Sequence, residues 1–174
     1  MVNKRESTRK FSDEKVDIDL VKRCVEAARL APSACNSQPW TFHIVSDPYR
    51  RQKIAQATLQ KGLALNKFAL EAPVLIVISV SKGNMRSKLG QMISGLPYYL
   101  IDVGIAAEHF CLQGTEEGLG TCMIGWFKEN KIKEHLNINR DERVALIIAG
   151  GYPSNETIRK KARKSLEEIT VFYD

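Results

Sequence analysis

The chain has 174 residues, of which 44% are hydrophobic and 26% are charged, and its formal net charge at pH 7 is +6. This is the size of one ordinary domain, so residues 1–174 are expected to form a single unit with its own core. The longest apolar run, residues 72–80, is too short to cross a bilayer and contains Pro73. The charged N-terminus leads into no apolar signal segment, which favours a cytoplasmic protein without membrane contact.

The positive charge and the cysteines exclude two further classes of protein. The basic excess lies at the two chain ends, and no aromatic residues interleave with it as they do in nucleic-acid-binding strands. We therefore expect no nucleic-acid partner. The cysteines at positions 24, 35, 111 and 122 form no C-x-x-C pair and have no metal-ligand spacing with the three histidines. The sequence therefore predicts reduced thiols and no metal.

The first third of the chain predicts a helix, a loop, a strand and a second helix. Apolar residues recur at helical spacing over residues 17–30, and Pro32 ends that helix. Residues 41–45 alternate as a half-buried strand does. Pro48 then begins a polar helix that extends to about residue 60.

The rest of the chain continues the alternation of strands and helices. Residues 74–81 are apolar and β-branched, which indicates a strand buried on both faces. Residues 82–97 have no firm period, and residues 98–117 predict a helix with a stripe of small residues. Residues 143–151 predict a further strand, and residues 169–173 can form a short one. The pattern alone suggests a layered α/β protein.

The loop at residues 31–40 carries the strongest functional signal. Pro32 and Pro39 fix the backbone near its ends, and between them lie small side chains with hydroxyl and carboxamide groups. Such a loop suits a flat heteroaromatic ligand whose edge alternates donors and acceptors. The alternative is an ordinary polar connection between a helix and a strand.

Basic residues at both chain ends suggest a phosphate site. Arg5 and Arg9 are four residues apart with Ser7 between them, so a helical segment would bring the three side chains to one face. Arginine forks and a hydroxyl are suited to a phosphate monoester. A second basic cluster occupies residues 159–164. The alternative for both segments is a solvated basic terminus.

Taken together, these segments resemble the nitroreductase family of FMN-dependent oxidoreductases. The likeness runs from about residue 4 to residue 170, and the motifs occur in the family's order. The matching residues are Arg5, Ser7, Arg9 and Phe11; the loop from Pro32 to Trp40; Gly118-Leu119-Gly120 with Cys122-Met123-Ile124-Gly125; and the basic pair Lys161 and Arg163.

The resemblance implies an α+β fold in place of the layered α/β one. Members of this family have a mostly antiparallel central sheet flanked by helices, and they form interlocked homodimers with FMN at the interface. In such a dimer, residues 169–173 would pair with the other subunit.

The resemblance also implies which residues bind the cofactor. The basic residues would hold the phosphate and one edge of the flavin, and residues of the 31–40 loop would line the isoalloxazine ring, with Asn36 coming from the partner subunit. The backbone at residues 124 and 125 would face N5, and glycine stands at 125 where some members carry glutamate. No side chain is expected to be catalytic, because flavin N5 carries the chemistry. The cofactor-binding set is Arg5, Ser7, Arg9, Pro32, Ser33, Ala34, Asn36, Asn66, Ile124, Gly125, Lys161 and Arg163.

The implied activity is transfer of hydride from NADH or NADPH through FMN to a nitroaromatic, quinone or similar small acceptor by a ping-pong mechanism. A second reading keeps the scaffold but changes the chemistry to dehalogenation, enoyl-type reduction or oxygen-dependent flavin cleavage. A third reading is a flavin carrier or sensor with little turnover. The physiological acceptor and the choice between NADH and NADPH stay open at this stage.

Overall fold

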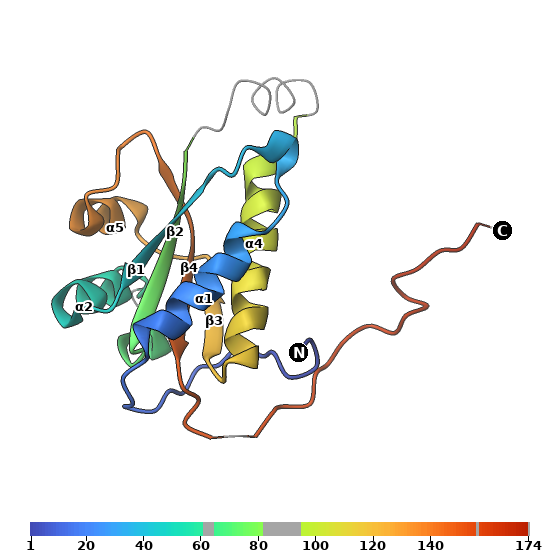
Figure 1. Cartoon of the computed structure of the whole chain (residues 1–174), viewed down its shortest axis with the longest axis horizontal. Coiled ribbons are helices and arrows are strands. Elements are labelled where there is room, and N and C mark those ends of the chain that lie inside the picture. The colour runs from blue at the N-terminus through green and yellow to red at the C-terminus, as the bar shows by residue number, and fades with distance from the viewer. Residues whose placement is uncertain (61–64, 82–94, 156, 174) are drawn as a thin grey trace.

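The most apolar strand of the sequence lies inside a four-stranded sheet that is covered on both faces. The computed structural model describes residues 1–60, 65–81, 95–155 and 157–173. Most of the segment predicted to lack a firm period, residues 82–94, lies outside this part of the chain. The elements are α1 (Ile18–Arg29), η1 (Ala34–Asn36), β1 (Trp40–Val45), α2 (Pro48–Ala57), η2 (Lys67–Leu70), β2 (Val74–Val80), α4 (Tyr98–Glu116), β3 (Gly120–Ile124), α5 (Glu129–Leu136) and β4 (Arg143–Gly151) (Figure 1).

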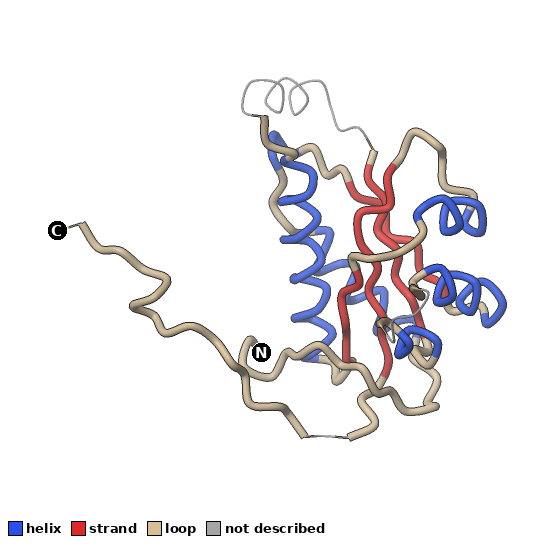
Figure 2. Tube along the Cα trace, turned by 180° about the vertical axis from the view of Figure 1, so that it is seen from behind, coloured by secondary structure: helices blue, strands red, loops and turns tan. Residues whose placement is uncertain are grey.

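The strands follow the order β1-β2-β4-β3, and each neighbouring pair is antiparallel. This confirms the α+β prediction, whereas the layered α/β reading required parallel strands. Helices α1 and α4 cover one face of the sheet, and α2, α5 and η2 cover the other (Figure 2). All residues of β2 are buried because both of its faces meet helices.

Local signals explain where the first two long helices begin. The Asp17 side chain accepts a hydrogen bond from the Asp19 amide, and the Asp47 side chain accepts one from the Arg50 amide. Pro48 occupies the first turn of α2, where its missing N–H costs nothing. The helices predicted over 17–30 and 98–117 are confirmed to within one residue at each end.

The structure contains two elements that the sequence did not predict, an edge strand of the sheet and a helix that packs on it. Residues 120–124 form β3, which lies at the edge of the sheet beside β4. Residues 129–136 form α5, whose Ile132 is fully buried against the sheet. The short strand predicted over residues 169–173 is absent from the single chain, because this part of the tail is exposed and has no strand beside it (Figure 1).

The N-terminal segment extends the sheet past β3. Ser7 forms an isolated parallel bridge with Thr121, and the Thr8 amide donates to the Thr121 carbonyl at 2.9 Å. This close approach requires glycine at position 120, because a Cβ there would lie 2.7 Å from the Thr8 side chain. A larger residue at position 120 would therefore push the N-terminal segment away from the edge of the sheet.

We expect Gly120→Ala to lower the free energy of unfolding by about 1–3 kcal/mol, the usual cost of overpacking a closed site. The matched control is Gly114→Ala, since a Cβ at this helical position meets its nearest neighbour at an ordinary 3.5 Å. That control should be neutral or stabilising by up to about 1 kcal/mol, because alanine favours the helix. Urea unfolding measures both values, and equal behaviour of the two variants would contradict this account of the contact.

Candidate functional site

The N-terminal basic motif is extended and not helical. Its pairing with the edge of β3 satisfies the backbone of residues 7 and 8, which leaves no reason for a helix to form. The helical arrangement considered for this segment is therefore not formed. The three side chains do not share one face either, because Arg5 contacts α4 and Arg9 contacts η2, which cover opposite faces of the sheet.

Each arginine of the motif has a defined partner. The Arg5 Nε lies 3.3 Å from the Glu108 carboxylate on α4, and the Arg5 side chain is only 21% exposed. The Arg9 guanidinium lies over the ring of Phe68 in η2, 5.8 Å from its centroid. The segment is thus held against α4 at Arg5 and against η2 at Arg9.

The pKa of the Cys122 thiol on β3 depends on several of the arginines at the two chain ends. Burial raises the pKa of Cys122, while Arg9, a hydrogen bond from Ser7, Arg159 and Arg5 act in the opposite direction. Three guanidinium groups from both chain ends therefore act on one point at the outer strand. Such a concentration of positive charge is suited to an anionic group.

The C-terminal basic cluster reaches the motif chiefly through Arg159. Its Nη2 donates to the Ser7 carbonyl at 2.7 Å, and its Nε lies 3.4 Å from the Glu6 carboxylate. Lys161 donates to the Asn3 carbonyl at 2.6 Å, whereas Arg163 bonds only its neighbour, the Ala162 carbonyl. The structure thus brings Lys161 to the N-terminal segment but not Arg163. Arg159 was missed as a site residue because nothing in residues 159–164 distinguishes one cation from the next.

The loop of residues 32–38 has an unusual backbone. Cys35, Asn36 and Gln38 have φ values of 52°, 50° and 41°, in the left-handed region that side-chain-bearing residues rarely adopt. Ser33 Oγ accepts from the Gln38 amide at 3.0 Å, and the Gln38 side chain donates to Asn36 Oδ1 at 3.0 Å. Backbone strain of this kind concentrates at functional sites.

The loop is also tied to α4. The buried carboxylate of Asp102 accepts from the Ala34 amide at 3.0 Å and from the Ser37 hydroxyl at 3.4 Å. Pro32 and Asn36 are exposed, while Ser33 and Ala34 are half-buried. The predicted loop residues are therefore at least partly accessible to a ligand, while the loop is fixed to α4 through Asp102.

The end of β3 exposes bare backbone. Ile124 is buried, but Gly125 is exposed, and a Cβ added there would meet nothing within 4 Å. The Asn66 side chain donates to the carbonyls of Thr58 and Trp126, both at 3.2 Å, so it fixes the chain one residue past Gly125. A flat ring can approach such a backbone closely because no side chain intervenes.

A cavity of about 250 Å³ lies beside Gly125. It lies where β4 extends past the last residue of β3, since Ile124 pairs with Ile147 and residues 143–146 of β4 continue unpaired on that side. The first turn of α4 forms another wall. Its lining residues are Tyr99, Leu100, Gly125, Phe127, Glu129, Arg143, Val144 and Ala145.

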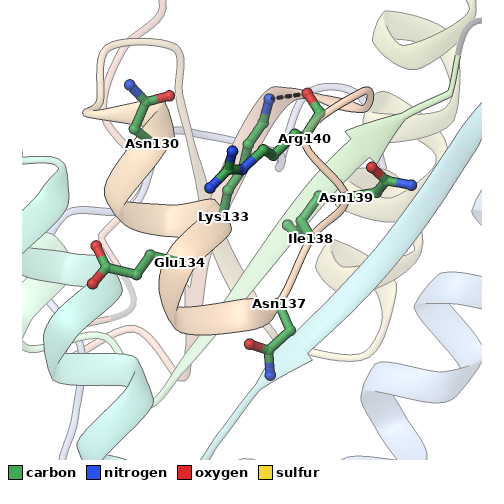
Figure 3. Close-up of a pocket in the computed structure, with 7 residues that line it drawn as sticks. All are labelled: Asn130, Lys133, Glu134, Asn137, Ile138, Asn139 and Arg140. Carbon is green, nitrogen blue, oxygen red and sulfur yellow. Dashed lines mark hydrogen bonds between the residues drawn. The ribbon is translucent and has the colours of Figure 1, made fainter.

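A larger cavity, of about 790 Å³, contains none of the predicted site residues (Figure 3). It lies between α5 and the loop that leads to β4. Lys133 is already paired, at 2.9 Å with Glu129 and at 3.3 Å with the Arg140 carbonyl. Glu134 and Arg140 also line this polar hollow.

Two other kinds of centre find no support in the described part of the chain. His43 Nε2 lies 2.9 Å from Ser79 Oγ, which donates to Glu142 at 2.7 Å, but Ser79 is fully buried and thus unavailable as a nucleophile. Among the described residues, no group of three or more His, Cys, Asp or Glu side chains is placed to hold a metal ion. No helix within those ranges is long and apolar enough to cross a membrane.

One chain does not bring all the predicted site residues together. The 32–38 loop lies at the N-terminal end of α4, whereas the N-terminal segment runs past the other end of that helix (Figure 1). The arginine motif, Asn66 and the end of β3 form one group, and the loop forms another.

Comparison with known proteins identifies the family of this chain. The model of the nitroreductase family matches residues 2–67 and 58–152. An iodotyrosine deiodinase from Haliscomenobacter hydrossis is 39% identical over 97% of this chain and 85% of its own. Iodotyrosine deiodinase 1 from Sus scrofa is 29% identical over 98% of this chain, which spans 66% of that longer protein.

Two further relatives carry reductase names. A Streptococcus pyogenes protein, provisionally named NAD(P)H nitroreductase Spy0809, is 28% identical over 95% of this chain and 94% of its own. A solved structure described as an FMN-dependent nitroreductase from Clostridium difficile superposes with a TM-score of 0.77 at 28% identity, covering 99% of this chain and 98% of the other. The chain belongs to the nitroreductase family, and its fold is that of the family.

Proposed function

We propose that this protein is an FMN-dependent oxidoreductase that takes hydride from NADH or NADPH and delivers it to a nitroaromatic, quinone or similar small acceptor in alternating half-reactions. The observation that carries the proposal is the convergence of Arg5, Arg9 and Arg159 on Cys122 of the outer strand β3, which is followed by the bare backbone of Gly125. Cations for a phosphate and an open peptide for a flat ring are the two requirements of FMN.

The residues of this chain would divide the work of holding FMN. Arg5, Ser7 and Arg9, with Lys161 and Arg163 or the neighbouring Arg159, would bind the phosphate and the polar edge of the ring. When bound, FMN supplies a hydride-accepting N5 atom. The backbone at Ile124 and Gly125 would face that atom, and Asn66 would keep this backbone in place through its bond to Trp126. No side-chain acid or base is required in this arrangement.

A homodimer would complete the site. The loop with Pro32, Ser33, Ala34 and Asn36 is separated from the arginine motif within one chain, so a second copy would supply it across an interface. The outer face of α4 supports this, because Leu100 and Ile101 are about half exposed and Gly104 beside them has open space around it. The C-terminal tail adds further exposed apolar side chains, namely Leu166, Ile169, Val171, Phe172 and Tyr173. Surfaces of this kind mark contacts with another chain.

The acceptor would enter beside Gly125. The cavity there has apolar and aromatic walls from Tyr99, Leu100 and Phe127, and Arg143 adds a cation. Its volume of about 250 Å³ suits one small aromatic molecule and leaves little room for a large one.

Reductive dehalogenation is the second candidate, and it rests on a specific observation. The two relatives named iodotyrosine deiodinase cover nearly all of this chain, one of them at 39% identity. The same cofactor site would serve this reaction, so the two candidates differ only in the acceptor. A flavin carrier or sensor would differ from both by slow reduction.

Purified protein loaded with FMN should lose its flavin absorbance on anaerobic addition of NADH or NADPH, and regain it when nitroaromatic or quinone is added. Stopped-flow absorbance at the flavin maximum measures both half-reactions. Bound flavin that persists in its oxidised form with either donor would contradict the reductase and favour the carrier. No binding of FMN at all would contradict the cofactor assignment itself.

Arg5→Ala should weaken FMN binding by about ten- to a hundredfold, because charge-assisted hydrogen bonds are worth about 1.5–3 kcal/mol. Arg29→Ala is the matched control, since Arg29 is exposed at the end of α1 and pairs only with Glu26. Fluorescence titration of the apoprotein with FMN gives both dissociation constants. If the two variants bind FMN equally well, Arg5 is not a phosphate ligand.

Reduced protein should distinguish the two candidate activities when it is offered a nitroaromatic and an iodinated tyrosine in parallel. A reductase of the first kind reoxidises at least about tenfold faster with the nitroaromatic, a difference of 1.4 kcal/mol in activation free energy. Rapid reoxidation by the iodinated tyrosine with release of iodide would instead assign dehalogenation. Free FMN at the same concentration controls for reaction in solution.

A further inference from the structure

Asp102 is a buried carboxylate in the second turn of α4, with 4% of its surface exposed. Carboxylates are rarely buried without a cation, because removing the charge from water is costly. Among the described residues, no lysine, arginine or histidine forms an ion pair with Asp102. Within the described ranges, it accepts hydrogen bonds from the Ala34 amide and the Ser37 hydroxyl, both in the 32–38 loop.

The two donors stand on either side of the strained backbone. Ala34 begins the short helix η1, whose N-cap residue Ser33 makes no side-chain capping bond, and Ser37 follows its end. Asp102 therefore supplies from α4 the acceptor that a capping side chain ordinarily supplies locally. Between the two contacts, Cys35 and Asn36 have positive φ values.

The hydrogen bonds within the loop do not involve the Ala34 amide, which bonds to Asp102. Ser33 Oγ is engaged with the Gln38 amide, and the Gln38 side chain is engaged with Asn36. These bonds shape the loop internally but do not attach it to another element. The two bonds to Asp102 attach it to α4.

We propose that Asp102 is a positioning residue that fixes the 32–38 loop on α4 in the conformation in which the loop lines the flavin ring. The proposal rests on the proposed function, since it assigns Asp102 a role toward FMN. Asp102 touches neither cofactor nor acceptor in this role. It acts through Ala34 and Ser37, and the strained turn between them is preorganised before FMN arrives.

The test compares Asp102→Ala, Asp102→Asn and the control Glu116→Gln, which removes an exposed carboxylate from the last turn of the same helix. FMN affinity is measured by titration of each apoprotein, and the unfolding midpoint of each apoprotein is measured alongside. We expect Asp102→Ala to bind FMN about ten- to a hundredfold more weakly, because two bonds to a charged acceptor are lost. Asp102→Asn keeps an acceptor oxygen for Ala34 and should stay within about threefold of the parent. Glu116→Gln should equal the parent.

The rescue by asparagine separates positioning from a purely structural role. A structural role would lower the unfolding midpoint of Asp102→Ala while the folded fraction bound FMN as the parent does, and that result would overturn the proposal. Asparagine and alanine variants of equally weak affinity would also overturn it. If Asp102→Ala does not fold, Ser37→Ala decides: loss of the longer of the two bonds, at 3.4 Å, predicts about two- to tenfold weaker binding, and unchanged binding refutes the role.

Failure of this inference is distinguishable from failure of the proposed function. A parent protein that binds no FMN refutes both. A parent that binds FMN, and an alanine variant that binds it equally well, refute only the role of Asp102.

Discussion

Helix α4 is the constraint on which the candidate site depends. Its 19 residues run the length of the sheet, and two of its carboxylates each hold one segment that we propose to bind FMN. Asp102 holds the 32–38 loop, and Glu108 holds Arg5. Six residues of α-helix separate them by about 9 Å along the axis. One rigid helix thus holds both segments that we propose for FMN, although they lie far apart in sequence and would serve the two different sites of the proposed dimer.

The outer strand β3 holds the N-terminal segment in place. An outer strand offers unpaired backbone groups, and the N-terminal segment uses those of β3 at Thr121. Gly120 permits the approach, and Arg159 then ties the C-terminal arm to the same segment through the Ser7 carbonyl. Both ends of the chain are thereby brought to one place, which explains how basic residues more than 150 positions apart act on a single thiol, that of Cys122.

Features with local causes could be predicted from the sequence, and features with distant causes could not. The buried strand at 74–80 and the helix at 98–116 follow from composition and period, which neighbours in sequence determine. The extended N-terminal segment depends on β3, more than 100 residues away, so its spacing was read as helical. The loop motif identified the family, yet its attachment was missed. The available signal was Asp102 itself, because a charged residue between Ile101 and Val103 in an otherwise apolar part of the helix suggests a polar partner on another element.

The division of labour in the site explains why one scaffold carries relatives with both reductase and deiodinase names. The arginine motif, the loop and the bare backbone at Gly125 are all suited to the cofactor, and none of them contributes an acid or base to an acceptor. In the proposed function, the acceptor would then be selected by residues that do not contact FMN. These residues line the cavity between the first turn of α4 and the unpaired start of β4. Tyr99 and Arg143 in that cavity make none of the contacts described above for the arginine motif or for the loop. In the proposed function, the contacts to FMN can therefore stay constant while the acceptor changes, because the walls beside Gly125 would determine which molecule reaches the flavin.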